Sequence, residues 1–485
     1  MFLIVFRIIS PQTKKTKKMK RQRQTVCVQG LGFVGAAMAV AVSLSRDNSG
    51  NCRYDVIGVE LPTEEGFRRV ESINEGQFPL PTIDQSLVLA TRNSVAEGNL
   101  SATTDQSVYE KAEVVIIDVA LDIPIGIDSR EINFSVLEEA AKTVGRSVRP
   151  GTLVIIETTV APGTCEKIII PILAKECKKR NLPEDSILVA HSYERVMPGN
   201  KYLDSIINFW RVFAGYTGDA AYSCRQFLET IINTKNFPLT ELSSLASSET
   251  AKIMENSYRA ANIAFIDEWT KFAEAIGIDL FEIIRAISIR PTHSNIRYPG
   301  VGVGGYCLTK DPLFAPAAAS QIFNLSGLSF PFIDLTQKIN QRMPYHVVDR
   351  LDQMFDMSLS RKRILIFGVS YRSDIGDSRY TPTETLVREL ETRDAVVLLN
   401  DPLVEFWDEM ERPVPSQLPD QSVDGVILAV AHTSYKQAQI FDWILNHSDV
   451  IVDAVDFFTA KEICLFETKG LRVCSIGRGG VKNHE

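Results

Sequence analysis

The sequence predicts an α/β fold in which two doubly wound, Rossmann-like domains are joined by a long helical spine. Three observations support this prediction. A short apolar strand runs straight into a glycine-rich turn near the start of the chain, further short apolar runs recur in both halves, and helical periodicity dominates between them. A chain of 485 residues is also too long for one ordinary core.

The first element in chain order is a β-α-β unit. An apolar strand at 25–29 leads into the turn Gly30-Leu-Gly32-Phe33-Val34-Gly35, a small-residue helix is expected at 36–45, and the next strand, 54–60, ends at Glu60. The first glycine allows a tight turn, the second lets the backbone approach a pyrophosphate, and the third lets the helix pack close to the strand. Because Glu60 would bind ribose hydroxyls and repel a 2′-phosphate, we predict NAD as the cofactor rather than NADP.

Near-continuous apolar runs predict the remaining strands, as expected for sheets covered by helices on both faces. They lie at 114–119, 152–156 and 187–190, and then, in a second doubly wound unit that begins after Pro344, at 363–368, 395–401, 425–429 and 450–453. Between the two units the region 241–288 has helical periodicity, with Gly277 ending one helix and Asp279 starting another. The second unit lacks the triple-glycine turn, so we assign it to a substrate nucleotide.

The segment 299–312, Pro-Gly-Val-Gly-Val-Gly-Gly-Tyr-Cys-Leu-Thr-Lys-Asp-Pro, puts Cys307 on a glycine-rich turn with Lys310 and Asp311 close behind it. Most free cysteines are small buried hydrophobes. A thiol on a turn beside a lysine can instead have a lowered pKa and act as a nucleophile. Combined with a nicotinamide site, it predicts oxidation of an alcohol or aldehyde to an acid through a covalent thiol intermediate.

Composition narrows the class of protein further. The net charge of −8 argues against a nucleic-acid partner. The eight cysteines are scattered without a Cys-x-x-Cys pair, so we predict neither a disulfide framework nor a metal site, and a reducing cytoplasm fits best. The apolar run 1–9 is too short to span a bilayer, and the basic residues follow it rather than precede it as in a secretory signal. We expect 1–24 to be a disordered basic tail or the product of an upstream start codon, with a weak membrane-surface anchor as the alternative, and no membrane span.

Seven motifs occur in one order along the chain: GLGFVG, ETTVAPGT, SYERVMPGN, ETAKIMENSYRAANIAF, PGVGVGGYCLTKDP, GVSYRSDIGDSRYTP and AVAHTSYK. Over about 25–460 the chain thereby resembles the UDP-glucose/GDP-mannose dehydrogenase family of nucleotide-sugar 6-dehydrogenases. The resemblance implies oxidation of the C6 hydroxymethyl group of a nucleotide sugar to a carboxylate, with two NAD per turnover.

The resemblance also implies catalytic roles. Cys307 matches the family nucleophile, and Asp311 matches an aspartate that positions water. Lys252 and Asn256, four apart on one helix face, match the pair that holds the oxygen bearing developing negative charge. Thr159 matches a threonine that orders water near C6 and the cofactor. Glu194 matches a candidate base for thioester hydrolysis, unless it only forms an ion pair with Arg195.

Binding roles follow in the same way. Lys310 and Arg379 match residues near the cofactor, Lys310 reaching its phosphates, while the segment from Tyr298 through Gly304 to Gly305 would offer backbone amides to the sugar nucleotide. The remaining expected substrate contacts are Glu194, Arg195, Lys252, Asn256, His293 and Arg372. His293 and Arg372 stand where many members have arginine and lysine, and Tyr193 replaces a proline. The segment 118–122, Asp-Val-Ala-Leu-Asp, replaces a Val-Pro-Thr-Pro segment of many members.

Four parts of the chain are therefore expected: the tail at 1–24, an NAD-binding Rossmann domain at 25–220, a central helical dimerisation domain with the cysteine turn at 221–344, and a UDP-sugar-binding α/β domain at 345–485. The long apolar helix of the spine predicts a homodimer or higher homo-oligomer. Arg-Val-Met-Pro-Gly after Glu194 favours UDP-N-acetylmannosamine or UDP-N-acetylglucosamine as substrate, with UDP-glucose as the alternative. A non-catalytic nucleotide-sugar-binding protein and a two-electron β-hydroxyacid dehydrogenase are the competing classes.

Overall fold

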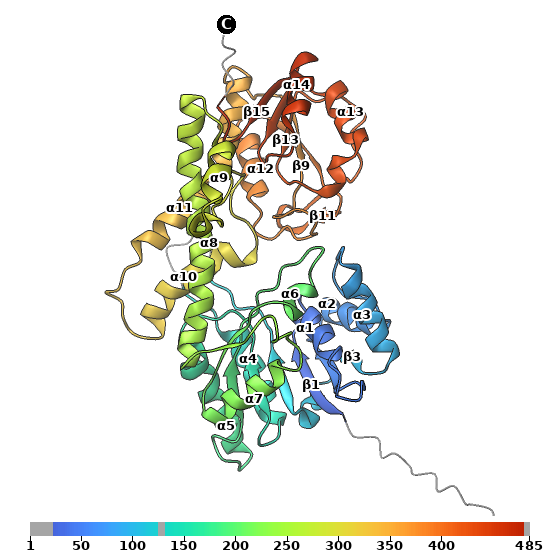
Figure 1. The fold of residues 1–485 in the computed structure, drawn as a ribbon, viewed down its shortest axis with the longest axis vertical. Coiled ribbons are helices and arrows are strands. Elements are labelled where there is room, and N and C mark those ends of the chain that lie inside the picture. Colours follow the sequence, from blue (N-terminus) through green and yellow to red (C-terminus); the bar gives the residue numbers. More distant parts are fainter. Residues whose placement is uncertain (1–22, 125–130, 480–485) are drawn as a thin grey trace, which may run out of the picture.

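The computed structural model describes residues 23–124 and 131–479 and contains two α/β units at opposite ends of an elongated molecule (Figure 1). The helices α8 (Leu245–Ile276) and α11 (Pro331–Met354) run between them. This arrangement confirms the predicted pair of doubly wound domains joined by a helical spine. Most of the expected tail at 1–24 lies outside the described residues, but its last residue, Gln24, already belongs to the first strand.

The N-terminal sheet has eight strands in the order β3-β2-β1-β4-β5-β6-β7-β8. The strands are β1 (Gln24–Gln29), β2 (Tyr54–Val59), β3 (Leu100–Thr103), β4 (Val114–Ile117), β5 (Leu153–Ile156), β6 (Leu188–His191), β7 (Val212–Gly215) and β8 (Thr240–Glu241). The first six are parallel, and β7 pairs antiparallel with β6. The sequence interpretation missed β3, β7 and β8, which are short or exposed and so lack a long apolar run.

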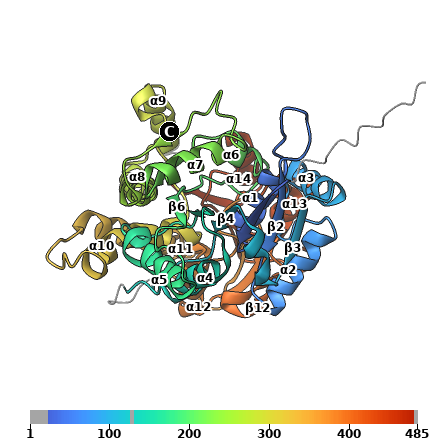
Figure 2. The same cartoon turned by 90° about the horizontal axis from the view of Figure 1, so that it is seen from below.

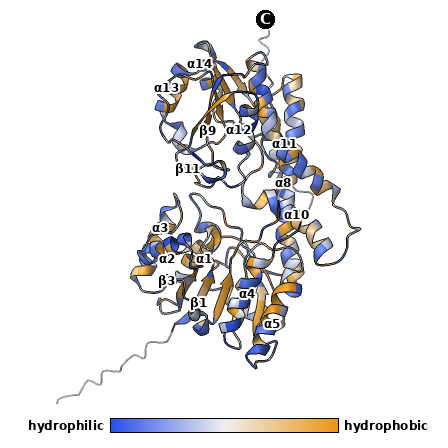
Figure 3. Ribbon diagram, turned by 180° about the vertical axis from the view of Figure 1, so that it is seen from behind, coloured by the Kyte–Doolittle hydropathy of each residue, from blue (hydrophilic) through white to orange (hydrophobic). Residues whose placement is uncertain are grey.

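Helices cover both faces of this sheet, and two separate apolar clusters fill the space between. The helices are α1 (Phe33–Ser43), α2 (Glu64–Asn74), α3 (Gln85–Ala96), α4 (Ser135–Ser147), α5 (Ile170–Lys179), α6 (Asp204–Ile207) and α7 (Gly218–Leu228). Figure 3 shows the hydrophobic residues concentrated in the strands. The strand order reverses between β1 and β4, and in doubly wound sheets this switch point is where ligands bind.

The first spine helix starts at Leu245, later than the predicted start at 241, which lies in β8, and it ends at Gly277 as predicted. Ser244 caps the start of α8 by accepting a hydrogen bond from the backbone N–H of Ser247, and Gly277, with φ of 81°, ends it in the left-handed conformation that glycine tolerates. Asp279 then caps α9 (Leu280–Ser288). Figure 2, turned by a right angle, shows α8 end-on beside the N-terminal sheet. One rigid helix therefore carries side chains to both domains.

The C-terminal sheet is parallel, with the order β10-β9-β13-β14-β15. Its strands are β9 (Arg363–Phe367), β10 (Val396–Asn400), β13 (Gly425–Leu428), β14 (Val450–Asp453) and β15 (Arg472–Ser475), and its helices are α12 (Pro382–Thr392), α13 (Ala438–His447) and α14 (Ala460–Thr468). The sequence predicted four of these strands. It missed β15 and the small hairpin β11 (Phe406–Trp407) and β12 (Arg412–Pro413).

Two expected domain boundaries lie inside helices. The boundary at 220/221 lies within α7, and the one at 344/345 lies within α11, which continues past Pro344 to Met354. Proline usually interrupts a helix because it lacks an N–H group. Here the residues that follow it on the same helix, Val347, Val348 and Leu351, are fully buried, so packing maintains the helix. The new unit therefore begins at β9 and not at Pro344.

Candidate active site

Cys307 lies in the first turn of α10 (Tyr306–Gln321), which corrects the prediction that it lies on a turn. The glycine run ends at Gly305, whose φ of 83° turns the chain into the helix one residue later. No side chain caps this helix, so its first N–H groups stay free near the thiol. Such groups favour a negatively charged sulfur. The Cys307 side chain is exposed.

The glycines before Cys307 let the C-terminal domain approach the helix start. A Cβ on Gly304 would lie 2.6 Å from Cδ of Pro382, and one on Gly305 would lie 2.5 Å from the ring of Tyr371. Both partners belong to the C-terminal domain, which therefore packs directly on the segment that carries the thiol. The glycines allow this close approach, and any side chain there would separate the two domains.

Below the thiol, Asp311 is a fully buried carboxylate with two polar partners. Asn256 Nδ2 donates to its Oδ2 at 2.7 Å, and Lys310 Nζ lies 2.9 Å from its Oδ1. Lys310 is itself 2% exposed and sits over the rings of Tyr306 and Phe314. Its ammonium is thus committed to Asp311, which contradicts the expectation that it reaches cofactor phosphates.

Lys252, one helical turn before Asn256, is buried and points to Glu194. Its Nζ lies 2.7 Å from the backbone oxygen of Glu194 and 3.4 Å from Oε1. The alternative ion pair between Glu194 and Arg195 is wrong, because Arg195 pairs with Glu255 through a bond of 3.0 Å from Nε to Oε2. The candidate base and the candidate oxygen-binding lysine therefore lie side by side.

Four charged groups act on the Cys307 thiol. Burial and the negative charge of Asp311 raise its pKa to about 11, while Lys252 and Lys310 lower it. Glu194 adds a smaller raising effect. The thiol side chain is exposed, yet protein from both domains surrounds it and limits its hydration. Lys310 thus acts in the predicted direction, but the net shift is upward because burial outweighs the two cations.

The glycine turn after β1 forms a cradle for an anion. Gly30 has φ of 90°, and a Cβ on it would lie 2.3 Å from the backbone oxygen of Asp118. Gly32 begins α1 with no side-chain cap and with nothing within 4 Å of an added Cβ. The open helix N-terminus therefore fits a pyrophosphate, as the motif predicted.

Glu60 lies beside this cradle at the end of β2. Its Oε1 accepts from the backbone N–H of Leu31 at 2.8 Å and from Arg69 at 3.0 Å. The carboxylate is held next to the turn, where a ribose would lie. Phe33 and Val34 open α1, and the Phe33 ring lies 5.2 Å from the guanidinium of Arg379.

Arg379 links the domains. It forms a two-pronged pair with Asp377, with bonds of 2.9 and 2.7 Å, and its guanidinium also lies 5.1 Å from the Tyr306 ring. The Tyr306 hydroxyl in turn donates to Asp122 at 2.5 Å. Contacts from the N-terminal, central and C-terminal parts of the chain therefore meet around the residue that precedes Cys307.

Other predicted residues are not joined to this cluster by contacts. Thr159, at the carboxyl end of β5, is half-buried, and its side chain makes no hydrogen bond to the described residues. His293 is exposed and bonds to its neighbour Thr292. Tyr298 stacks on Phe281 of α9, and Arg372 is exposed at the domain junction.

Sequence reasoning missed several residues that the structure brings here. Tyr193 is buried and donates to Glu255 at 2.9 Å, and Tyr371 covers the glycine turn. Asp118 and Asp122 border the cofactor cradle and Tyr306. Asp118 and Asp122 both lie in 118–122, and the signal in the sequence for them is that this segment replaces the Val-Pro-Thr-Pro segment expected from the resemblance.

Within 23–124 and 131–479 no cluster of His, Cys, Asp or Glu could hold a metal ion. Across these same residues no helix has the length and apolarity needed to cross a membrane.

Comparison with known proteins agrees with this arrangement. Three models of the UDP-glucose/GDP-mannose dehydrogenase family match: the NAD-binding domain at residues 24–231, the central domain at 246–342 and the UDP-binding domain at 365–460. A UDP-N-acetyl-D-mannosamine dehydrogenase of Methanocaldococcus jannaschii is 28% identical, covering 94% of this chain and 96% of that protein. An NDP-N-acetyl-D-galactosaminuronic acid dehydrogenase of Ralstonia nicotianae is 26% identical, covering 91% and 97%.

A solved structure of UDP-D-ManNAc dehydrogenase from Pyrococcus horikoshii has a TM-score of 0.77 at 26% identity and covers 94% of this chain and 100% of that one. The fold and the cradle define an NAD-dependent oxidoreductase. The chain belongs to the UDP-glucose/GDP-mannose dehydrogenase family. It is thus a nucleotide-sugar dehydrogenase with NAD as cofactor, and its C-terminal domain is the UDP-binding domain.

Proposed function

We propose that the protein oxidises the C6 hydroxymethyl group of a UDP-N-acetylhexosamine, UDP-N-acetylmannosamine or UDP-N-acetylglucosamine, to the uronic acid. The observation that carries the proposal is an exposed thiol at a helix N-terminus, with Lys252, Asn256, Asp311 and Glu194 gathered beneath it. The names of the relatives and the Arg-Val-Met-Pro-Gly segment after Glu194 support an N-acetylhexosamine. UDP-glucose is the second candidate.

NAD, when bound, would accept the hydride from C6 of the sugar. The chain's own residues supply the rest. Lys252 donates to the C6 oxygen as negative charge develops on it, in a site where burial strengthens the interaction. Loss of a first hydride from C6 and of the hydroxyl proton to solvent gives the C6 aldehyde. Cys307 Sγ, as the thiolate, adds to this aldehyde to give a thiohemiacetal, and loss of a second hydride and of the hydroxyl proton gives a thioester.

Water then cleaves the thioester, and the thiolate leaves. Glu194, 3.4 Å from the Lys252 ammonium, can take a proton from this water, and Thr159 at the carboxyl end of β5 can orient it. Asp311 keeps Lys310 and Asn256 in place through its two bonds. Lys252 and Lys310 favour the Cys307 thiolate, although burial and Asp311 outweigh them and raise the pKa of the thiol to about 11.

In this proposal the N-terminal α/β domain binds NAD, the central helices carry the thiol and the subunit contact, and the C-terminal α/β domain, which begins at β9, binds UDP. Arg372, His293, Arg195, Tyr298 and Gly304 are proposed substrate contacts, and Arg379, Phe33, Val34 and Glu60 border the cofactor. Catalysis in the cytoplasm, with the uronic acid used for polysaccharide synthesis, is consistent with the substrate class.

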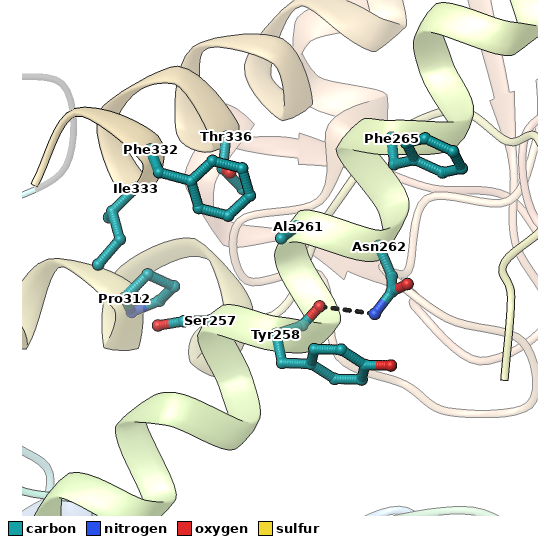
Figure 4. A pocket seen from close by; sticks show the side chains of 9 residues that line it. All are labelled: Ser257, Tyr258, Ala261, Asn262, Phe265, Pro312, Phe332, Ile333 and Thr336. Carbon is teal, nitrogen blue, oxygen red and sulfur yellow. Dashed lines mark hydrogen bonds between the residues drawn. The ribbon is translucent and has the colours of Figure 1, made fainter. Parts of the chain in front are cut away.

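We also propose a homodimer through α8. Its outer face exposes Tyr258, Phe265, Trp269 and Phe272, which are each about half exposed. Figure 4 shows a hollow between this face and α10 and α11, lined by Tyr258, Ala261, Phe265, Pro312 and Phe332 among others. So large an apolar surface is costly to leave in water, and a second copy of α8 would cover it.

The deciding experiment counts NADH formed per UDP-sugar consumed, across UDP-N-acetylmannosamine, UDP-N-acetylglucosamine, UDP-glucose and GDP-mannose. Two NADH per sugar is expected. One would indicate a two-electron dehydrogenase, and none a binding protein.

Cys307→Ser tests the covalent step. A serine hydroxyl is far less ionised than a thiol, so the variant should bind the sugar nucleotide yet stall after the first oxidation or hold an ester visible by mass spectrometry. Near wild-type production of the uronic acid would refute the role of Cys307.

A further inference from the structure

Asp118 directly follows β4 at the switch point of the N-terminal sheet. Gln29 lies opposite Ile117 in the paired strands, so Gly30 and Asp118 leave the sheet side by side. A Cβ on Gly30 would lie 2.3 Å from the backbone oxygen of Asp118, and a Cβ on Gly35 would lie 3.0 Å from Asp118 Oδ2. The Asp118 carboxylate therefore lies against the glycine cradle that fits the cofactor.

The Asp118 side chain has no hydrogen-bond partner among residues 23–124 and 131–479, although it is half-buried. Its backbone is firmly held. The Asp118 N–H donates to Gln29 at 2.9 Å, and Thr158 Oγ1 donates to the next carbonyl, that of Val119, at 2.8 Å. Half-buried carboxylates usually have partners, so this one is available to a ligand.

Charged groups on several elements act on the Asp118 carboxyl. Glu194 follows β6, Arg211 precedes β7, and Lys252 projects from α8, while the Tyr202 hydroxyl is the neighbouring neutral titratable group. Burial and Glu194 raise the pKa of Asp118 to about 8, against the lowering effects of Arg211 and Lys252. Its protonation thus changes close to neutral pH, and one additional nearby charge can decide it.

The chemistry places the nicotinamide near this carboxylate. The sugar carbon that gives up a hydride is the one that Cys307 attacks, so the nicotinamide end of a cofactor bound at the Gly30 turn must extend toward Cys307. The segment 118–122 runs from the Gly30 turn, where Asp118 lies, to Tyr306, whose hydroxyl donates to the backbone oxygen of Leu121 and to Asp122. Because Tyr306 directly precedes Cys307, Asp118 lies at the start of a path from the cradle to the thiol. The nicotinamide ring is positively charged in the oxidised cofactor and neutral in the reduced one.

We propose that Asp118 discriminates between the two oxidation states of the bound cofactor: the carboxylate favours the cationic ring of NAD⁺, and the neutral carboxylic acid favours NADH. Binding of NAD⁺ therefore releases a proton from Asp118, and binding of NADH retains or takes up one. The inference depends on NAD as the cofactor and adds a role for a residue of the segment 118–122.

The test is isothermal titration calorimetry of the full chain with NAD⁺ and with NADH, in buffers of different ionisation enthalpy, without sugar. In the wild type the ratio of the NADH to the NAD⁺ dissociation constant should rise about tenfold between about pH 6.5 and about pH 9.5, with opposite proton exchange for the two cofactors. Asp118→Asn should abolish the pH dependence of this ratio. Glu110→Gln, which removes an exposed carboxylate in the same domain, should preserve it.

A ratio that keeps its pH dependence in Asp118→Asn would overturn the inference. So would equal weakening of both cofactors with a lowered melting temperature, since that is the signature of a packing residue. Asp118→Ser provides a second neutral variant if the first does not fold. A wild type that binds neither cofactor would contradict the cofactor assignment itself and this inference with it.

Discussion

Replacing Lys310 by methionine should destabilise the protein by about 3–5 kcal/mol, because it leaves a buried carboxylate without its countercharge. Asp311 is fully buried, Lys310 is 2% exposed, and their atoms Oδ1 and Nζ are 2.9 Å apart. After the substitution Asn256 Nδ2, at 2.7 Å, is the remaining polar partner of Asp311 that the structure describes. One amide cannot replace an ammonium, so most of the desolvation cost of the charge becomes uncompensated.

The assay is equilibrium urea unfolding at neutral pH. Lys178→Met is the matched control, because its ion pair with Glu184 is 3.4 Å long and the two side chains are 77% and 63% exposed. That pair should contribute about 1 kcal/mol or less. The double variant Lys310→Met/Asp311→Asn removes both charges and should recover much of the lost stability.

The same substitution gives an independent chemical readout. Lys310 is one of two cations that lower the pKa of Cys307, so its loss should raise that pKa further and slow alkylation of the thiol at a fixed pH. A Lys310→Met variant no less stable than Lys178→Met, or a double variant as unstable as the single one, would refute the reasoning.

Three further predictions concern other parts of the molecule. Glu249 accepts backbone bonds from Gly163 and Cys165, and burial raises its pKa to about 7 from 4.5. The folded state thus holds this proton more tightly than the unfolded state. The stability that this contributes is present below about pH 4.5 and is lost as the pH rises through about 7, which amounts to about 3 kcal/mol. Glu249→Gln should remove this loss. Gly305→Ala should lower activity and stability, since its φ is 83° and the added Cβ would lie 2.5 Å from a ring of the other domain. Glu60→Ala should weaken NAD binding and reduce the preference for NAD over NADP by about tenfold, because it frees Arg69 to meet a 2′-phosphate.

Each of these three predictions can be tested by comparing the variant with a control or with the wild type. Urea unfolding at several pH values should give a flatter profile for Glu249→Gln than for the wild type, and parallel profiles would refute the role of Glu249. Gly98→Ala has the same backbone strain, with φ of 71°, but nothing within 4 Å of the new Cβ, so equal losses in the two glycine variants would show that domain approach is irrelevant. For Glu60→Ala, titration with NAD and NADP provides the measurement, and an unchanged ratio would contradict the assignment.

Much of the fold was predictable because it is determined by local signals. The buried strands carry continuous apolar runs, and Gly277 and Asp279 mark helix ends by their own backbone and capping chemistry. Strands such as β8, two exposed residues long, are formed by pairing with a distant strand, so no local signal reveals them. Pro344 misled the boundary because packing of distant residues outweighed its local preference.

The features of the candidate site also differ in whether local sequence signals predict them. The glycine cradle and the Lys252–Asn256 spacing follow from short motifs. The partner of each charge does not: Arg195 pairs with Glu255, 60 positions away, instead of with adjacent Glu194, and Asp311 takes its second bond from a different helix. The upward shift of the Cys307 pKa also depends on how much protein surrounds the thiol, which no spacing in the sequence encodes.

The packing of Tyr371 and Pro382 on the glycines before Cys307 affects how the enzyme loses activity on heating. Each sheet has its own apolar clusters and can keep its secondary structure while the two lobes part. Separation of the two domains alone would remove Tyr371 and Pro382 from the glycine segment that precedes Cys307. Thermal inactivation should therefore precede the loss of far-ultraviolet circular dichroism, and a substrate spanning both lobes should delay inactivation more than the cofactor alone.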